Sequence, residues 1–208
     1  MATKVMTDVV VDREVHSART RVLDAAAQLI FDKGFFATSM RDIAAAVGIK
    51  AGSLYHHFNS KEEIFIAILE RGIDVMVSAF DQVCAQEAEG GFANAEALVQ
   101  AHVRAHLASL FEFGPYTAAH VTTFHNAPTA VHEIVVERRD AYEAMWAGLI
   151  ERLDQQGSLQ VDDPTIARLV LLGGMNTTVE WFDPGGTMSL DGLAEWIAKQ
   201  FLNGVGAP

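Results

Sequence analysis

The sequence predicts an all-α protein of about nine helices, in which a small three-helix amino-terminal unit precedes a larger helical body. Apolar residues recur three and four positions apart along most of the 208 residues, and no stretch alternates in the manner of a strand. Glycine, proline and capping residues divide these stretches into helix-sized segments. Half of the residues are apolar, which is enough for a packed core.

The first three helices are short and closely spaced. The first is predicted over Ala18–Lys33, where apolar residues share one face and Gly34 supplies the left-handed conformation that ends a helix. Thr38 is placed to cap a second helix over Ser39–Val47. After a further glycine, a third helix is predicted over Lys50–His57.

Six further helices are predicted in the body. Ser60 and Glu63 form a capping box that begins a long helix ending near Glu87. Breaks at Gly90, Gly114-Pro115, Gly157 and Asp183-Pro184-Gly185-Gly186 separate the helices that follow. These are predicted over Ala95–Phe113, from Pro115 to about Phe124, from Pro128 to Gly157, from Asp163 through Val179, and from Ser189 through Phe201.

The segment from Ala44 to Glu63 has the order helix, tight turn, short helix and newly capped helix. Gly48 provides the turn, and Leu54 and Phe58 point inward from the short helix at a spacing of four. The residues left for its outer surface are Lys50, Ala51, Ser53, Tyr55 and His56. A short helix held at a steep angle in this way can lie against a nucleic-acid duplex.

Two runs of residues in this region carry a family resemblance. Thr38-x-Met40-Arg41-Asp42-Ile43-Ala44 is followed by Gly52-Ser53-Leu54-Tyr55-His56-His57-Phe58-x-Ser60-Lys61-Glu62. Over about residues 18 to 66 this resembles the amino-terminal domain of TetR-family transcriptional regulators. The resemblance implies an N-terminal helix-turn-helix DNA-binding domain over residues 17–63. It would lie between a mobile arm over 1–16 and an effector-binding and dimerisation domain over 64–208.

The candidate DNA contacts are short donors and cations around the second and third helices. Lys50 could donate to guanine edges, Ala51 could touch a thymine methyl, and Gly52 would allow close approach. The family more often has a small hydroxyl residue at Lys50, so a side-chain cap should be missing there. The full set is Thr38, Ser39, Arg41, Lys50, Ala51, Gly52, Ser53, Tyr55, His56 and Lys61. The resemblance implies that Tyr55 and His56 contact the phosphate backbone; packing of Tyr55 on the first helix is the alternative.

Charge is distributed unevenly along the chain. The formal net charge is -12, and all of this excess lies in residues 72–208, because the nine basic and nine acidic side chains of residues 1–71 cancel. Residues 13–61 contain seven basic and four acidic side chains. This distribution favours a head that approaches DNA and a body that phosphate repels.

The family resemblance implies an effector pocket among the middle helices, with Phe111, Tyr116, Phe124, Trp146, Met175 and Trp181 as candidate lining residues. Arg104, Arg138 and Arg139 are the cations that could face inward. The run Asn176-Thr177-Thr178-x-x-Trp181-Phe182-x-Pro184-Gly185-Gly186 is similar to the carboxyl-terminal domain of TetR-type regulators of fatty-acid and sterol catabolism, whose effectors are acyl-coenzyme A thioesters. The effector is therefore expected to be small and either apolar or an acyl thioester. The resemblance further implies that effector binding releases a repressor from its operator.

Histidines offer a competing hypothesis. His102 and His106 lie four apart on one helical face, and His120, His125 and His132 come from neighbouring helices. A metal-responsive regulator could be built from them, although polar histidines with ordinary hydrogen-bond partners are the simpler interpretation. No metal site and no cofactor are therefore predicted.

The last two helices are expected to pair with their copies in a homodimer, which would place two reading helices on a palindromic operator. The predicted seam comprises Leu169, Leu172, Val179, Leu193, Trp196, Ile197 and Phe201. No nucleophile motif or phosphate loop favours an enzyme, and an architectural DNA-binding protein without an effector remains the other alternative. The lack of a long apolar segment predicts a cytoplasmic location, with no membrane partner.

Overall fold

The computed structural model describes residues 18–205; the predicted amino-terminal arm lies outside them. Within this range the chain forms nine α-helices and two short 3-10 helices, with no strand. The α-helices are α1 (Ala18–Lys33), α2 (Met40–Val47), α3 (Ala51–Leu54), α4 (Lys61–Ala88), α5 (Ala95–Phe111), α6 (Pro115–Thr123), α7 (Thr129–Gln155), α8 (Pro164–Asn176) and α9 (Leu190–Val205). The 3-10 helices are η1 (Phe124–Asn126) and η2 (Thr177–Glu180). The predicted all-α class is confirmed.

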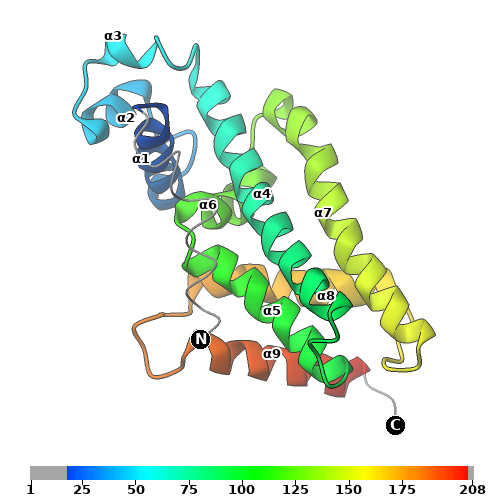
Figure 1. The fold of residues 1–208 in the computed structure, drawn as a ribbon. Helices are drawn as coiled ribbons and strands as arrows, with labels where there is room; N and C mark the ends of the chain where they lie inside the picture. Colours follow the sequence, from blue (N-terminus) through cyan, green and yellow to red (C-terminus); the bar gives the residue numbers. More distant parts are fainter. Residues whose placement is uncertain (1–17, 206–208) are drawn as a thin grey trace.

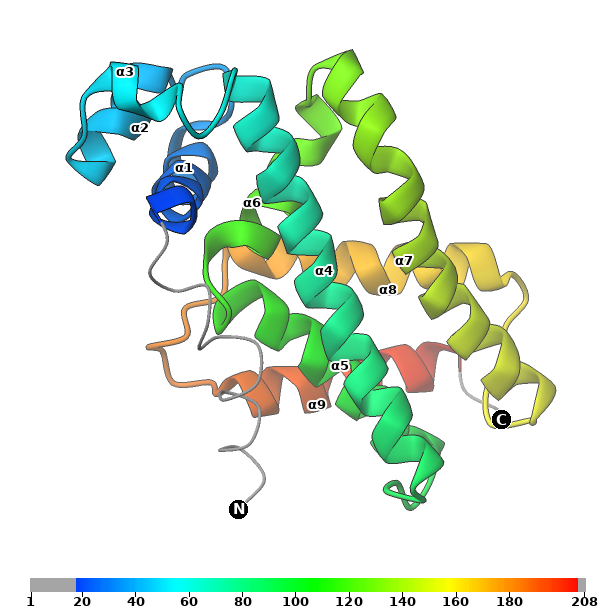
Figure 2. The ribbon, with the colours of Figure 1, turned by 45° about the horizontal axis from the view of Figure 1, so that its top comes forward.

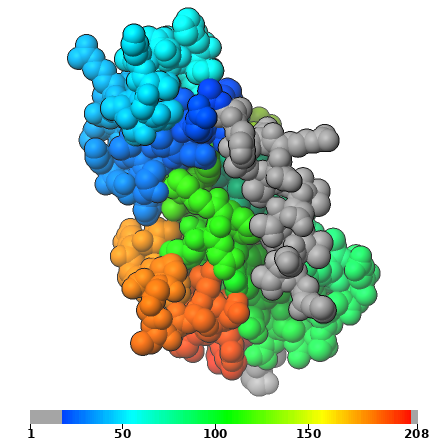
Figure 3. Space-filling model, turned by 60° about the vertical axis from the view of Figure 1, so that its left-hand side comes forward, coloured from blue at the N-terminus to red at the C-terminus, as the bar shows by residue number. Residues whose placement is uncertain are grey.

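Helices α1 to α3 form a head at one end of the molecule (Figure 1). The apolar faces of α1 and α2 meet there, and Val22, Ala26 and Ile43 are completely buried. Gly34 and Gly48 both adopt positive φ, at 82° and 76°, which explains why glycine ends each of these helices. The space-filling view places the head opposite the carboxyl-terminal helices (Figure 3).

The long helix α4 connects the head to the body. Its 28 residues would extend about 42 Å at 1.5 Å per residue. Ser60 accepts a hydrogen bond from the Glu63 amide, as predicted. The Glu63 carboxylate, however, accepts from the Asn59 amide at 2.8 Å and not from Ser60, so the expected reciprocal box is only half formed.

The body surrounds the lower part of α4. Helices α5, α6 and α7 pack against α4, while α8 and α9 cross the molecule below the head (Figures 1 and 2). Helix α5 packs along α9, and α7 packs on α8. The predicted helix through Val179 is interrupted, because α8 ends at Asn176 and continues as η2. Leu107, Val135 and Trp146 are among the fully buried residues of the body.

Candidate functional site

Helix α2 is fixed at its start by Ser39, which is the capping residue in place of the predicted Thr38. Its hydroxyl accepts from the Asp42 amide, and the Asp42 carboxylate accepts from the Ser39 amide and hydroxyl. The Ser39 hydrogen bonds hold the pKa of Asp42 below its ordinary value. Ser39 is exposed, but its hydroxyl belongs to this capping box.

The segment Lys50–His57, predicted as the third helix, is the candidate DNA-reading segment, and its helical part is shorter than predicted. Only Ala51–Leu54 is α-helical, and the residues from Tyr55 to His57 continue as turns, with the His57 amide bonded to the Leu54 carbonyl at 2.9 Å. Lys50 occupies the capping position and makes no side-chain capping bond, as expected from its replacement of a hydroxyl residue. Leu54 and Phe58 are 0% and 1% exposed, which anchors the segment to the core.

Most of the predicted DNA contacts lie on the outer surface of the head. Arg41, Lys50, Gly52, Tyr55 and His56 are exposed. Tyr55 is 55% exposed, so much of its side chain is accessible on the surface of the head. Ala51 and Ser53 are half-buried beside them. The structure therefore leaves the candidate DNA-contact residues around α3 accessible from outside the head.

Two of the predicted DNA-contact residues, Thr38 and Lys61, form hydrogen bonds inside the head. Thr38 is 1% exposed, and its hydroxyl donates to the Gly34 carbonyl at 2.9 Å and to the Leu29 carbonyl at 3.3 Å. Lys61 Nζ donates to the Phe35 and Thr38 carbonyls, both at 2.8 Å. Both side chains are thus committed to the loop between α1 and α2. The prediction that the Thr38 hydroxyl meets phosphate is wrong for this arrangement, because burial removes it from the surface.

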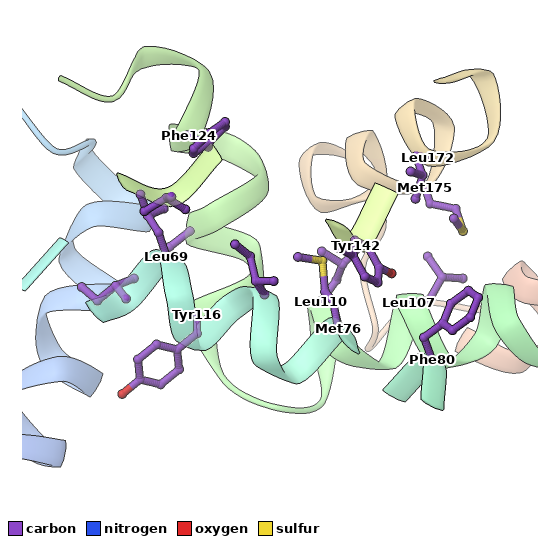
Figure 4. Packing of buried hydrophobic residues seen from close by; sticks show 14 of the residues in the cluster. Leu69, Met76, Phe80, Leu107, Leu110, Tyr116, Phe124, Tyr142, Leu172 and Met175 are labelled. Atoms are coloured by element: carbon purple, nitrogen blue, oxygen red, sulfur yellow. The ribbon is translucent and has the colours of Figure 1, made fainter. Parts of the chain in front are cut away.

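The body contains a cavity of about 230 Å³ among α4 to α8 and η1. Its mouth is formed by exposed or half-buried side chains of η1, α7 and α8, and its floor by buried side chains of α4, α5, α6 and α7. Figure 4 shows Tyr142 of α7 near Met76 of α4, with Leu172 of α8 nearby. The lining residues are Met76, His106, His120, Val121, Phe124, His125, His132, Arg139, Tyr142, Glu143, Arg168, Leu169, Leu172, Gly173 and Asn176.

Three of the predicted ligand residues fall inside the body, but with different roles. Phe124 lines the cavity, 5% exposed, with its ring stacked on that of His132. Trp146 and Met175 are 1% and 0% exposed and belong to the core beside the cavity. Large apolar side chains on amphipathic helices are mostly core, which is why the pattern could not separate the two roles.

The other three predicted ligand residues lie away from the cavity. Phe111 packs edge-to-face on Phe182, with ring centroids 5.2 Å apart. Trp181 is 60% exposed. Tyr116 faces the head, where its hydroxyl donates to the Asp24 carboxylate of α1. The prediction that Phe111, Trp181 and Tyr116 line the cavity is therefore wrong.

The cavity floor carries a hydrogen-bonded network. His106 Nδ1 lies 2.7 Å from the Tyr142 hydroxyl, and His106 Nε2 lies 3.0 Å from Asn176 Oδ1. Burial lowers the pKa of His106 to about 4 and raises the pKa of Tyr142, so both groups are neutral near pH 7. The floor is therefore polar, contrary to the purely apolar pocket that the aromatic residues suggested.

Charged side chains form one wall. Glu143 pairs with Arg139 one turn before it on α7 and with Arg168 of α8. Arg139 was predicted to face inward and does line the cavity, whereas Arg104 and Arg138 pair elsewhere, with acidic side chains on the surface. The sequence pattern did not single out Arg168 because its partner, 25 residues earlier, is recognisable only after folding.

The histidines do not assemble as a metal centre within residues 18–205, where no group of three or more His, Cys, Asp or Glu side chains is arranged to hold an ion. His102 packs on Phe80, with ring centroids 4.2 Å apart, instead of joining His106 in a ligand pair. His106, His120, His125 and His132 do gather, but as cavity lining.

Helix α6 joins the cavity to the head. His120 lines the cavity, and one helical turn earlier Tyr116 contacts Asp24 of α1 and lies under the Arg71 guanidinium, 4.4 Å from the ring centroid. Against α4, a Cβ built on Gly72 would lie 2.8 Å from the Tyr116 carbonyl oxygen. The α4–α6 contact is thus close enough that movement of one helix displaces the other.

Exposed apolar side chains occur on α8, on α9 and in the segment between η2 and α9. They are Ile166, Leu169, Val170, Trp181, Met188 and Trp196. Of the predicted seam, Leu169 and Trp196 are on this surface, and Val179 and Ile197 are half-buried. Leu172, Leu193 and Phe201 are buried in the chain's own core, so that part of the predicted seam is not available to a second copy.

A helix-turn-helix head with an exposed reading segment, joined through α4 and α6 to a body with a cavity, defines a DNA-binding regulator of the one-component type. The amino-terminal model "Bacterial regulatory proteins, tetR family" matches residues 22–68, and "Tetracyclin repressor-like, C-terminal domain" matches residues 93–205. The chain belongs to the TetR family of transcriptional regulators. No described helix has the length and apolar character needed to span a membrane.

Relatives match along nearly the whole chain. The HTH-type transcriptional repressor KstR2 of Rhodococcus jostii is 33% identical over 91% of this chain and 92% of its own. Among solved structures, the TetR-family regulator PfmR of Thermus thermophilus has a TM-score of 0.75 at 27% identity, covering 88% of this chain and 97% of its own. AibR, solved with isovaleryl coenzyme A and operator DNA, shares the fold with a TM-score of 0.75 at 24% identity, covering 91% and 98%.

Proposed function

We propose that the protein is a homodimeric transcriptional repressor that binds a palindromic operator in the cytoplasm and is released by an acyl-coenzyme A thioester. The observation that carries this proposal is one chain with both an exposed reading surface and a cavity, joined by packed helices. An architectural DNA-binding protein would need no such cavity.

DNA binding is supported by the residues around α3. Arg41 and Lys50 supply exposed cations, and Tyr55 and His56 supply donors for phosphate oxygens. Ala51 and Gly52 at the start of α3 leave room for the backbone to approach base edges. Lys61 and Thr38 contribute by holding the α1–α2 loop in place.

Dimer formation is supported by the exposed apolar side chains of α8 and α9. Val170 and Trp196 are 66% and 55% exposed, although side chains of this kind are normally covered. A two-fold axis through this surface would bring a second head to the same side, so that two reading segments could meet half-sites one or more DNA turns apart.

An acyl thioester is supported by the size and chemistry of the cavity. A cavity of about 150 Å³ holds one benzene molecule, so 230 Å³ accommodates about nine carbon-sized atoms, enough for a short or medium acyl group but not for coenzyme A. Arg139, Arg168 and His125 near the mouth suit an anionic carrier left outside. KstR2 is named a repressor and AibR was solved with an acyl-coenzyme A, which agrees with both parts of the proposal.

Release would follow from movement of α6. An acyl group entering the cavity presses on His120 and Phe124, and α6 transmits the displacement through Tyr116 to α1. The effector then binds more tightly to the form in which the two heads no longer match the operator spacing.

Fluorescence anisotropy of labelled DNA from the chain's own upstream region tests the proposal. We expect binding at low ionic strength that weakens as salt rises, loss of binding in Lys50→Ala, and release by micromolar acyl-coenzyme A. Binding that no acyl thioester reverses would favour the architectural alternative. A monomer that ignores this DNA at low salt would refute the proposal altogether.

A further inference from the structure

The cavity floor holds more hydrogen-bonding capacity than a hydrocarbon ligand needs. His106 and Tyr142 are 2% and 4% exposed, and they face the cavity together with the half-buried Asn176. Buried polar groups are costly unless they are paired. Here His106 pairs with Tyr142 and with Asn176, so three polar side chains from α5, α7 and α8 meet at one end of the cavity.

The amide oxygen of Asn176 fixes the direction of the network. Because Asn176 Oδ1 can only accept from His106 Nε2, the neutral ring accepts at Nδ1, where the Tyr142 hydroxyl donates a hydrogen bond. The other ring nitrogen then donates to Asn176 Oδ1. The Asn176 amide nitrogen remains, and no residue of the described chain accepts a hydrogen bond from it. The Asn176 amide nitrogen thus presents two N–H groups beside the cavity. The hydrogen bond from His106 Nε2 to Asn176 Oδ1 holds this amide in a fixed orientation.

We infer, building on the proposed function, that the acyl group of the effector carries a hydroxyl or keto oxygen near its far end, which accepts a hydrogen bond from Asn176 within the His106–Tyr142–Asn176 network. The position follows from burial. Leu169, Gly173 and His125 at the mouth are exposed, whereas His106 lies at the closed end, and the Asn176 side chain reaches it from α8 with its Oδ1 3.0 Å from His106 Nε2. If the thioester lies at the mouth, the opposite end of the acyl group lies at the His106–Tyr142–Asn176 network.

A plain hydrocarbon of the same length would be the weaker effector. It would cover the Asn176 amide and the outer side of the Tyr142 oxygen without offering either a hydrogen-bond partner. Sites built to bond a substrate oxygen reject the analogue that lacks it for this reason. Because His106 already satisfies part of the network, we expect a preference of about tenfold and not the largest ratios known.

Operator release by matched eight-carbon probes tests the inference. Octanoyl-coenzyme A, 7-hydroxyoctanoyl-coenzyme A and 7-oxooctanoyl-coenzyme A differ only at the far end, and 3-hydroxyoctanoyl-coenzyme A carries its oxygen near the thioester. The expected order has both 7-substituted probes about tenfold more potent than octanoyl and 3-hydroxyoctanoyl. Equal potency of all four probes would overturn the inference and leave the proposed function standing.

Variants separate binding from a purely structural role. Tyr142→Phe and Asn176→Leu should reduce the potency ratio of 7-hydroxyoctanoyl to octanoyl toward one, with DNA binding retained. Gln82→Leu removes an exposed amide of α4 outside the cavity, so it should leave this ratio unchanged. If Tyr142→Phe and Asn176→Leu lower the unfolding midpoint but keep the wild-type ratio, the network only braces α5, α7 and α8, and the inference is wrong. Failure of every thioester to bind would refute both the inference and the proposed function.

Discussion

The hydroxyl of Thr38 lies inside the head and not on its DNA-facing surface. It bonds to the carbonyls of Leu29 and Gly34 at the end of α1, while Lys61 reaches the carbonyls of Phe35 and Thr38 from α4. Gly34, Phe35 and Thr38 follow the end of α1, so their carbonyls have no helical partners, and these two side chains supply donors. A residue that precedes α2 can therefore contribute to DNA binding indirectly, by fixing the loop between α1 and α2.

Thr38→Val separates the two roles of this residue. The near-isosteric change removes the hydroxyl donor, so we expect the free energy of unfolding to fall by about 1 kcal/mol. Urea denaturation of the purified protein measures this loss. Ser39→Ala, which removes the α2 cap, is the comparison, with an expected loss of similar size. Unchanged stability of Thr38→Val with weakened operator binding would instead return Thr38 to the set of direct contacts.

At the scale of whole elements, α6 is, together with α4, a helix through which head and body meet. It packs against α1 and α4 at once, and the absence of a side chain at Gly72 allows its backbone to approach α4. Such an approach requires glycine because any Cβ would overlap the Tyr116 carbonyl. The spacing between α4 and α6 is thus set by one residue.

Gly72→Ala should push these two helices apart. The added methyl would meet the Tyr116 carbonyl at 2.8 Å and His120 Cβ at 3.0 Å, so we expect a loss of about 1–3 kcal/mol in stability and an altered response to effector. Thermal unfolding and operator release together measure both effects. Gly148→Ala on α7 is the matched control, since nothing lies within 4 Å of its Cβ, and it should stabilise by up to about 1 kcal/mol. Equal behaviour of the two variants would contradict close packing at Gly72.

At the scale of the whole molecule, the exposed apolar side chains of α8 and α9 belong to the body, in which α9 lies farther from the head than α8 (Figure 1). The acidic excess of the chain also lies in the body, which phosphate repels. A dimer formed there would join two bodies and leave both heads free.

Val170→Glu tests this arrangement. A carboxylate placed without a partner in the dimer seam should raise the dimer dissociation constant by about a hundredfold, and operator affinity should fall with it. Analytical ultracentrifugation over a range of concentrations measures the first effect. Ile134→Glu alters a similarly exposed apolar residue on α7, 54% exposed, and should leave the dimer intact. A dimer unaffected by Val170→Glu would place the interface elsewhere.

Local signals predicted the fold better than the site. Caps, glycines and helical spacing located nearly every helix, because each acts within one turn of the chain. Thr38 and Ser39 were confused because either hydroxyl can begin a helix, and only the bond to Gly34 distinguishes them. The cavity could not be predicted in the same way, because core residues and cavity-lining residues show the same helical spacing of apolar side chains. Asn176 and Arg168 line it through partners distant in sequence, which periodicity does not encode.

The buried imidazoles give the molecule a definite response to acid. Desolvation lowers the pKa values of His102, His106 and His120 to about 4, whereas in the unfolded chain they return to about 6.5. The unfolded state therefore gains protons first as pH falls, and each ring withdraws about 1.4 kcal/mol of stability per pH unit between those values. Down to about pH 5 the inner end of the cavity keeps the same charge. Mild acidification would thus lower the free energy of unfolding while the imidazoles of His106 and His120 at the inner end of the cavity stay neutral.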